Sequence, residues 1–411
     1  MISKDLKFWF ERGRQEATNV SFHSNKRTIQ QLVQHGMRHA LNQYPHLKNL
    51  DFLKLLEELN EQRLESEPDL QVYPELKGLK ACYRERQRGF MEAGQCTRSE
   101  MAFYYNWYWH ETKRLHTRAG QTAPATDGGC TVVYFKDSPD GPLLGRNNDF
   151  SLNRVGIPRL PDWNVLVHSP IASVALCDEE PREIFPADPF ELMSEEIMRD
   201  IEQVVAFLKR YNEFWGPCAT VVIDKRGNSV AIEKFNCRMG VTYPKNGASY
   251  VTSFGYQDPA MQAHKIACDR RYMQRVGITE ESPDWAFWRG CDRRLARLTQ
   301  LVTDETRRGP TLAGVGRIMT DHAVPFPDRI CLAGEPDNTG LWTVASFSCV
   351  MHGDRRRMLY WRVEDGKACY AGPPYLIPGD GVAVQEDWRS GTRSRPADEP
   401  FSDAVITIQR Y

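Results

Sequence analysis

A cysteine that follows two glycines has the strongest case for chemistry in this chain. Residues 121–129 are small, polar and rich in turn-forming types, and they lead directly into Cys130, so this stretch is expected to be an exposed loop. In such a loop the Cys130 thiol can attack the carbonyl of Gly129, and water then releases a new α-amine on the cysteine. A free α-amine has a reference pKa of roughly 7.7–8.0 and a thiol one of about 8.5, so the amine can act as general base for the thiol of its own residue. These residues predict a nucleophile that cleavage of the Gly129–Cys130 bond uncovers.

A β-hairpin is expected directly after the cleavage point. Strand-forming residues at 130–135 and 143–150 flank a turn that holds two prolines and one glycine. A turn centred near Pro139 places Cys130 opposite residues 147–149. The hairpin therefore brings the residues of its second arm back to the cysteine.

Arg146 and Asp149 are the charged residues on that second arm. Asp149 would accept hydrogen bonds from the α-ammonium of Cys130, and Arg146 would stabilise the thiolate. Side chains alternate between the two faces of a regular strand, so both residues reach the cysteine only if the strand bulges or bends between them. Gly145 and the asparagine pair at 147–148 are residue types that permit such an irregularity.

The composition is that of an ordinary globular protein. The chain has 411 residues, 41% hydrophobic and 26% charged, with a net charge of −1, which gives no reason to expect binding to nucleic acid or to an acidic membrane. Its sequence has no apolar run near the ~20 residues that cross a bilayer and no secretory signal. Eleven cysteines without a Cys-x-x-Cys pair argue against a disulfide framework and against a zinc module. We expect a cytoplasmic protein.

The elements around the hairpin follow an antiparallel α+β pattern. Residues 1 to about 125 have helical periodicity and little strand signal. Amphipathic helices are expected at 28–44, 50–64, 74–93 and from Ser99, where Thr97 and Glu100 form a capping box. After the hairpin, helices are expected at 190–211, 259–275, 290–307 and 311–320, and strands at 164–176, 218–224, 229–235, 249–254, 341–351, 358–364, 368–370 and 404–409. Hairpins separated by runs of helices are typical of the α+β class.

His35 and His39 stand at i and i+4 of the first expected helix, which is the spacing of two zinc ligands. Position 36 is a glycine where a metalloprotease motif needs a glutamate, and the sequence offers no third ligand cluster. Packing or surface histidines are the preferred interpretation, so no metal or other cofactor is expected.

The residues around Cys130 resemble a known group of enzymes. The run Gly129-Cys130-Thr131, followed by Gly145-Arg146-Asn147-Asn148-Asp149-Phe150, is similar to the N-terminal-nucleophile (Ntn) hydrolases with an N-terminal cysteine. These are the acyl-CoA:6-aminopenicillanate acyltransferase family and its relatives, the choloylglycine hydrolases and penicillin V acylases. In the relatives, an arginine sixteen and an aspartate nineteen residues after the cysteine form the core of the site, and Arg146 and Asp149 match that spacing. Supporting likeness lies at 74–79, 321–322, 330–331, 343–346 and 354–360.

The resemblance implies two further site residues. Ser253 stands where the family has an asparagine that helps to form the oxyanion hole, and a hydroxyl reaches less far than an amide. Arg294 is the best match to an arginine that the family carries on a helix after that strand. Arg293 and Arg297 are neighbours of the same type, and a solvated helix face is the alternative for all three.

The resemblance also implies a fold and an activity. The fold is a four-layer αββα Ntn sandwich over residues 130–411, preceded by a helical prosegment at 1–129. The prosegment is expected to stay bound after cleavage, because its apolar stripes need a surface to cover them. The activity is acyl transfer through a Cys130 thioester, either hydrolysis of a small N-acyl amine or transfer to an amine from an acyl thioester, with acyl-CoA as a candidate co-substrate. The expected partners are this small molecule and the prosegment; homo-oligomer formation stays open.

Two other interpretations stay open. A non-catalytic member that kept the fold for binding is favoured by Ser253 and opposed by the intact Cys130, Arg146 and Asp149. A papain-like thiol hydrolase needs a histidine partner for its cysteine. The available histidines, none with a supporting motif around it, are His264, His322 and His352.

Overall fold

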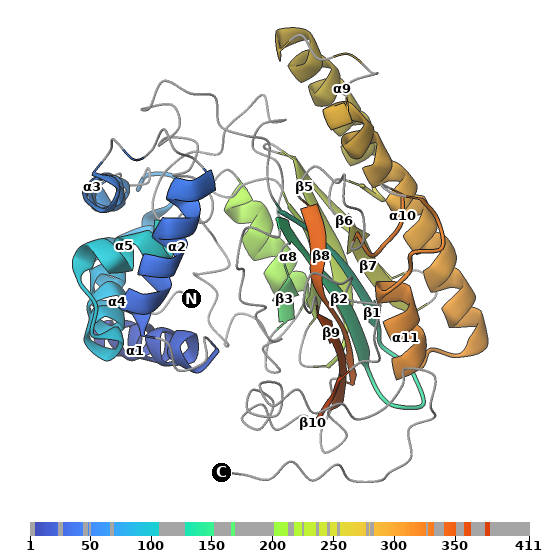
Figure 1. The fold of residues 1–411 in the computed structure, drawn as a ribbon, viewed down its shortest axis with the longest axis horizontal. Coiled ribbons are helices and arrows are strands. Elements are labelled where there is room, and N and C mark those ends of the chain that lie inside the picture. Colours follow the sequence, from blue (N-terminus) through green and yellow to red (C-terminus); the bar gives the residue numbers. More distant parts are fainter. Residues whose placement is uncertain are drawn as a thin grey trace.

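The computed structural model has helices in its N-terminal part and two antiparallel sheets with covering helices in the rest (Figure 1). This arrangement confirms the expected α+β class. The structure describes residues 5–23, 28–43, 48, 51–65, 70–106, 128–151, 166–168, 201–212, 218–223, 226–235, 238–244, 247–252, 255–276, 279, 283–325, 328–332, 341–350, 357–362 and 375–378.

The N-terminal helices are α1 (Leu6–His23), α2 (Ile29–Gln43), α3 (Phe52–Glu65), α4 (Leu79–Gly94) and α5 (Arg98–Asn106). The helices expected at 28–44, at 50–64 and from Ser99 are confirmed. The helix expected at 74–93 is divided, because Pro74–Leu76 form a 3-10 turn and Gly78, with a φ of 79°, precedes α4. Helix α1 is an addition to the expected helices.

The predicted capping box fixes the start of α5. The Thr97 backbone N–H donates to Glu100 Oε2 at 2.8 Å, and the Glu100 backbone N–H donates to Thr97 Oγ1 at 3.2 Å. These reciprocal bonds satisfy two backbone donors that a helix start would otherwise leave without a partner.

Helices α1 and α4 approach closely through two glycines. A Cβ atom on Gly13 would lie 1.9 Å from the backbone oxygen of Arg86, and one on Gly89 would lie 2.0 Å from the backbone oxygen of Phe10. Real Cβ atoms cannot come that close to a backbone oxygen, so the crossing depends on glycine at both positions.

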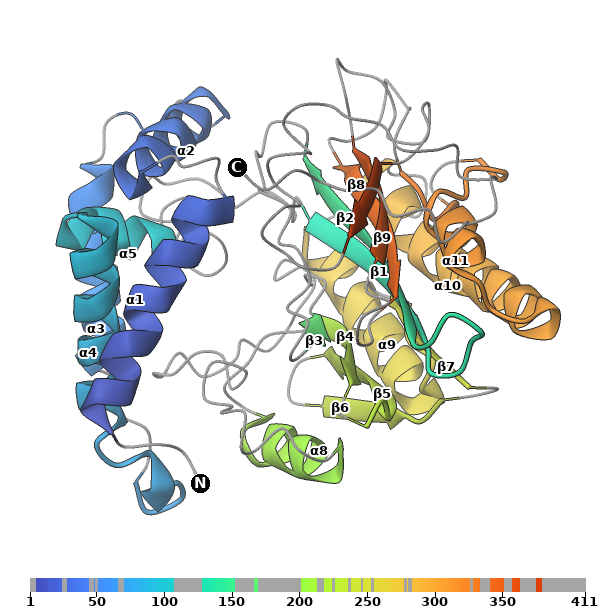
Figure 2. The ribbon, with the colours of Figure 1, turned by 90° about the horizontal axis from the view of Figure 1, so that it is seen from below.

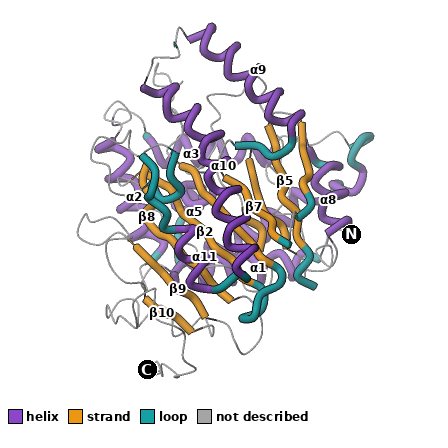
Figure 3. Tube along the Cα trace, turned by 90° about the vertical axis from the view of Figure 1, so that its right-hand side faces the viewer, coloured by secondary structure: helices purple, strands orange, loops and turns teal. Residues whose placement is uncertain are grey.

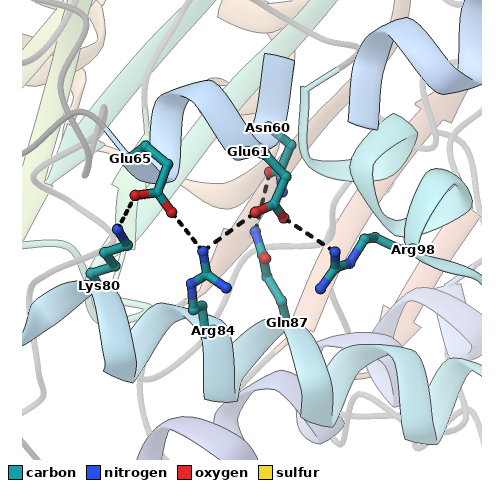
Figure 4. A network of polar contacts seen from close by, with 7 residues as sticks. All are labelled: Asn60, Glu61, Glu65, Lys80, Arg84, Gln87 and Arg98. Atoms are coloured by element: carbon teal, nitrogen blue, oxygen red, sulfur yellow. Dashed lines mark hydrogen bonds and ion pairs between the residues drawn. The ribbon is translucent and has the colours of Figure 1, made fainter. Parts of the chain in front are cut away.

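Charged side chains join α3 to α4 and α5 along their exposed sides (Figure 4). Arg84 pairs with Glu65 at 2.8 Å and with Glu61 at 3.4 Å. Lys80 also pairs with Glu65, and its hydrogen bond lowers the pKa of that carboxyl. Because such exposed pairs contribute little, the buried apolar residues beneath them hold the helices together, among them Ala17, Ile29, Val33, Leu56, Phe90 and Met101.

The larger sheet has six strands in the order β10-β9-β8-β2-β1-β7, and the smaller has four in the order β3-β4-β5-β6. The strands are β1 (Gly128–Phe135), β2 (Leu143–Ser151), β3 (Leu166–His168), β4 (Cys218–Ile223), β5 (Ser229–Phe235), β6 (Arg238–Thr242), β7 (Ala248–Thr252), β8 (Leu341–Val350), β9 (Arg357–Arg362) and β10 (Tyr375–Pro378). Both expected hairpins, β1–β2 and β4–β5, are confirmed. Strands β6 and β10 are additions, and the strands expected at 368–370 and 404–409 lie outside the described residues.

Helices cover one face of the six-stranded sheet. They are α10 (Pro283–Arg308) and α11 (Leu312–Met319), which lie across its strands (Figure 3). The core between them contains Val133, Phe135, Leu143, Leu298, Val302, Val315 and Met319. Helix α10 begins earlier than the expected residue 290, whereas α11 matches its expected range closely.

The opposite face of the six-stranded sheet meets the four-stranded sheet. The Tyr134 hydroxyl on β1 donates to the Gly227 carbonyl at 2.9 Å, and the hydroxyls of Ser229 and Ser249 are hydrogen-bonded at 2.8 Å. Helix α9 (Pro259–Val276) follows β7, and its Met261 packs near Gly240 of β6.

In the described part, no helix is both long and apolar enough to span a membrane.

Helix α8 (Ile201–Arg210) lies between the N-terminal helices and the sheets (Figures 1 and 2). One side of α8 packs on the four-stranded sheet, in a core that contains Ile201, Val204, Val205, Leu208, Val222, Val230 and Ile232. Tyr211, at its C-terminal end, is buried instead with residues of the N-terminal part, including Trp9, Tyr73, Leu76 and Tyr83. The described helix covers part of the range expected at 190–211, and residues 190–200 lie outside the described residues.

We predict that Gly13→Ala destabilises the protein, because the added methyl group must push α1 away from the backbone of α4. Such overpacking costs roughly 1–3 kcal/mol. Urea unfolding followed by circular dichroism measures the loss. Gln15→Ala, on the exposed side of the same helix, is the matched control and is expected to leave the midpoint unchanged. Equal midpoints for Gly13→Ala and the control would contradict the close crossing.

Candidate active site

The predicted pairing of the first hairpin is confirmed. Cys130 lies opposite Asn148, and Gly129 lies opposite Asp149. The Gly129–Cys130 peptide bond is therefore part of strand β1 and faces the Asn148–Asp149 segment of β2. The backbone alone brings the expected cleavage point and the expected carboxylate to adjacent positions.

The irregularity expected in this region lies on the β8 side of β2. The β2–β8 register shifts between Asn148 and Asp149: Asn148 pairs with Ala345 and Asp149 with Thr343. The β1–β2 register runs without a shift, and Arg146 lies opposite Val132. Positions 146 and 149 therefore stay on opposite faces of the sheet. Arg146 is buried, with 6% of its surface exposed.

Asp149 forms a fully buried ion pair with Arg294. Arg294 Nη2 donates to Asp149 Oδ2 at 3.0 Å, and both side chains have 0% exposure. The two residues were predicted separately as site residues, and the structure shows that they form a pair. A buried charge is tolerated only when it is paired and hydrogen-bonded, so each residue depends on the other.

Further hydrogen bonds hold the Arg294 guanidinium in place. Its Nε donates to the Arg329 carbonyl at 3.1 Å, and its Nη2 also lies 3.2 Å from Thr131 Oγ1 and 3.2 Å from the Ile330 carbonyl. The side chain thus links α10 to β1, β2 and the segment after α11. A solvated helix face, the alternative interpretation for this arginine, is wrong because the side chain is completely buried.

The neighbouring arginines hold the same segment against α10. Arg293 Nε donates to both carboxylate oxygens of Asp328 at 2.7 Å. Arg297 makes two bonds to Asp321, at 3.0 and 2.6 Å, and these bonds raise its pKa. Both pairs are structural, since they hold Asp321 and Asp328 against α10 and stand outside the buried cluster.

Asn147 and Thr131 also belong to this cluster, although neither was predicted as a site residue. Asn147 Nδ2 donates to the Met319 carbonyl at 2.8 Å and to the Ile330 carbonyl at 3.1 Å. Thr131 Oγ1 also lies 3.3 Å from the hydroxyl of Thr252 on β7. Positions 131, 147 and 149 share one face of the hairpin, so the alternation of side chains was the signal that could have identified them.

The remaining candidates have different outcomes. Ser253 and His352 lie outside the described residues, although Thr252 pairs directly with Thr131 and leads into position 253. His264 lies on α9, where its Nε2 is 3.7 Å from Cys268 Sγ. His322 is exposed, and its Nδ1 is 2.8 Å from the Thr320 carbonyl.

The described residues contain no set of side chains that could bind a metal ion. Among the described residues, no three histidine, cysteine, aspartate or glutamate side chains are close enough to hold an ion. Helix α2 carries His35 and His39, but their side chains lie outside the description.

We predict that Asp149→Asn strongly destabilises the protein because it leaves the Arg294 charge buried without its partner, at a cost of about 3–5 kcal/mol. The double variant Asp149→Asn/Arg294→Gln removes both charges and is expected to be more stable than Asp149→Asn alone. Chemical denaturation of the two single variants and the double variant measures the coupling. Strictly additive losses would contradict a direct ion pair.

Comparison with known proteins identifies no relative from which a function could be inferred. No protein-family model matches the sequence, and no curated protein is significantly similar to it. The case for an activity therefore depends on the Gly129–Cys130 bond and on the buried cluster opposite it.

Proposed function

We propose that this protein is a self-activating N-terminal-cysteine enzyme that transfers acyl groups through Cys130. The observation that carries the proposal is the pairing of Gly129 with Asp149, whose carboxylate is buried and bound by Arg294. A glycine–cysteine bond, a fixed carboxylate and a fixed guanidinium thus come from three separate parts of the sequence. Their convergence supports the resemblance to the Ntn hydrolases.

Activation would begin with an internal attack. The Cys130 sulfur adds to the Gly129 carbonyl carbon, the C–N bond breaks, and the nitrogen takes up a proton. The product is a thioester between Gly129 and the Cys130 side chain. Water hydrolyses this thioester, which leaves a carboxylate on Gly129 and a free α-amine and thiol on Cys130.

Catalysis would then use the new amine as its base. The amine accepts the thiol proton while sulfur attacks an amide or thioester carbonyl, and it returns the proton to the departing amine or thiol. The acyl group remains on Cys130 as a thioester until water or an acceptor amine removes it. Hydrolysis of N-acyl amines and transfer from an acyl thioester such as acyl-CoA share these steps.

Each candidate residue has a proposed role. Asp149, held by Arg294, would orient the α-ammonium of Cys130, since it lies opposite Gly129, the residue whose bond to Cys130 breaks to release that ammonium. Arg146 would favour the thiolate by its charge. Ser253 would donate a hydrogen bond to the oxyanion. The serine at that position favours one second candidate, a catalytically impaired binding protein of the same fold.

We assign the αββα sandwich to residues 130–411 and the prosegment to residues 1–129. Support for the sandwich comes from α10 and α11 on one sheet, α8 on the other, and direct contacts between the sheets. Support for a prosegment that stays bound comes from its contact with α8. Cytoplasmic location and homo-oligomer formation stay predictions.

That contact combines stacking, charge and hydrogen bonds. The rings of Tyr73 and Tyr211 stack at 5.8 Å, and the Arg210 guanidinium lies 4.6 Å from the centre of the Tyr73 ring. Glu75 Oε1 accepts from Arg210 Nε at 3.1 Å and from the Tyr211 hydroxyl at 2.9 Å. Burial of apolar rings around a charge-assisted bond is typical of an interface that holds without a covalent link.

We predict that the purified protein separates into fragments spanning residues 1–129 and 130–411, and that Cys130→Ala remains one chain. Denaturing intact-mass measurement decides this. Cys96→Ala is the matched control and is expected to cleave normally, because burial and the Glu100 carboxylate raise the pKa of that thiol to about 11. A wild-type chain that stays intact would overturn self-activation.

The cleaved protein would then be assayed against panels of N-acyl amines and acyl thioesters, per folded molecule. Arg146→Ala and Asp149→Asn are expected to be inactive. The double variant Asp149→Asn/Arg294→Gln, called here the charge-neutral pair, also lacks the Asp149 carboxylate but leaves no unpaired buried charge. It therefore tests the role of Asp149 with less loss of stability, and it is expected to be inactive too. Full activity in Arg146→Ala or in the charge-neutral pair would remove the corresponding residue from the proposed site.

We predict that acid weakens the contact between the prosegment and α8. Burial acts to raise the pKa of Glu75, but hydrogen bonds from its own backbone, Arg210 and Tyr211 outweigh it, so the pKa lies below the ordinary value of 4.5. A lowered carboxyl pKa stabilises the contact above pH 4.5, and this contribution is lost as the pH falls through the lowered value.

Native mass spectrometry of the two fragments, co-expressed as separate chains, measures this contact. Dissociation at neutral pH is expected to increase in Glu75→Gln, which also loses the acid dependence. Glu85→Gln is the matched control, because Glu85 pairs with Arg88 within α4. Identical behaviour of the two variants would show that Glu75 does not anchor the prosegment.

A further inference from the structure

Asn147 occupies the centre of the six-stranded sheet and is completely buried. Its backbone lies in β2 between Thr131 of β1 and Ser346 of β8. An apolar residue is the usual occupant of such a position, because a buried amide must find hydrogen-bond partners. The side chain of Asn147 has 0% exposure, so its role must lie in the bonds that it makes.

Both of its strong bonds go to backbone carbonyls. Asn147 Nδ2 donates to Met319, the last residue of α11, at 2.8 Å, and to Ile330 at 3.1 Å. These carbonyls stand at the two ends of the segment that Arg293 and Arg297 hold against α10. The Asn147 amide therefore binds both the Met319 and the Ile330 carbonyl to β2.

The Ile330 carbonyl is shared with Arg294. It accepts from Asn147 Nδ2 at 3.1 Å and from Arg294 Nη2 at 3.2 Å, while the same Nη2 binds Asp149 at 3.0 Å. A chain of contacts thus runs from Asn147 through this carbonyl to Arg294 and on to Asp149, opposite the Gly129–Cys130 bond. Moving the carbonyl would turn the guanidinium and displace the carboxylate.

The Asn147 amide satisfies two carbonyls but leaves its own oxygen without a partner in the described part of the chain. Among the described residues, neither its Oδ1 nor Arg294 Nη1 has a hydrogen-bond partner, although both atoms are buried. Such groups are costly in a folded protein and call for an explanation.

We infer that Asn147 is a positioning residue for the cleavage of the Gly129–Cys130 bond. It fixes the Ile330 carbonyl, this carbonyl fixes Arg294, and Arg294 sets the position of Asp149 beside the reacting bond. The inference deepens the proposed function and depends on it. Misplacing a positioned group by about 1 Å can slow a reaction about 100-fold, so the effect should be large although Asn147 touches no reacting atom.

The test measures the rate of fragment formation by intact mass after a pulse of cell-free synthesis. Asn147→Ala is expected to cleave about 10- to 100-fold more slowly than the wild type. Asn147→Ser, which keeps one donor, is expected to show an intermediate rate and replaces the alanine variant if that one fails to fold. Val133→Ala, in the core beneath the same sheet, is the control for destabilisation and is expected to keep the wild-type rate per folded molecule.

A double-mutant cycle separates positioning from a general structural effect. If Asn147 acts through Arg294, the serine or alanine substitution adds no further slowing to Arg294→Lys. Wild-type rates in both Asn147 variants, or effects that multiply with Arg294→Lys, would overturn the inference and leave the proposed function standing. A wild-type chain that never cleaves would overturn the proposed function and this inference together.

Discussion

The buried ion pair between Arg294 and Asp149 is the interaction on which the rest of this structure depends. Removing two charges from water is expensive, and the attraction between them offsets that cost only when other groups complete their hydrogen bonds. Arg294 therefore also binds Thr131 and the carbonyls of Arg329 and Ile330. These partners come from β1 and from the segment after α11, and Asp149 itself comes from β2, so the pair can form only in the completed fold.

Helix α10 and the segment after α11 hold the Arg294–Asp149 pair in place. Helix α10 carries Arg294 and packs on the sheet through Leu298 and Val302. Its other arginines, Arg293 and Arg297, bind Asp328 and Asp321 and thereby hold the segment that supplies the carbonyls. Asn147 closes the same segment from the side of the sheet. The result is a fixed carboxylate opposite the backbone of Gly129.

The N-terminal helices are a second unit with its own constraints. Glycines let α1 and α4 cross at backbone contact, and a separate apolar core joins α2, α3 and α5 to them. The contact of this unit with the sheets runs through α8, where Tyr73 and Glu75 meet Arg210 and Tyr211. A bound but separable prosegment would need this combination of a self-contained core and one specific contact.

The sequence alone determined the local features of this protein. The first hairpin and its register followed from turn residues and strand formers that lie close together in the chain, and the Thr97–Glu100 capping box followed from the spacing of two residues. Both are confirmed because neighbouring residues decide them. The sequence also singled out Asp149 and Arg294, but as separate candidates, and it did not identify α1, whose buried face of Trp9, Gly13 and Ala17 contains too little apolar surface to stand out.

Only the tertiary structure decided which distant residues meet. Strand β8 pairs with β2 from almost two hundred residues further along the chain, and that pairing, not the hairpin, contains the register shift expected near Asp149. The partnership of Asp149 with Arg294 and the bonds of Asn147 likewise depend on how α10 and α11 pack against the sheet. Local residue types set the backbone conformation of a hairpin, whereas the partner of a buried charge is set by long-range packing, which no short stretch of sequence encodes.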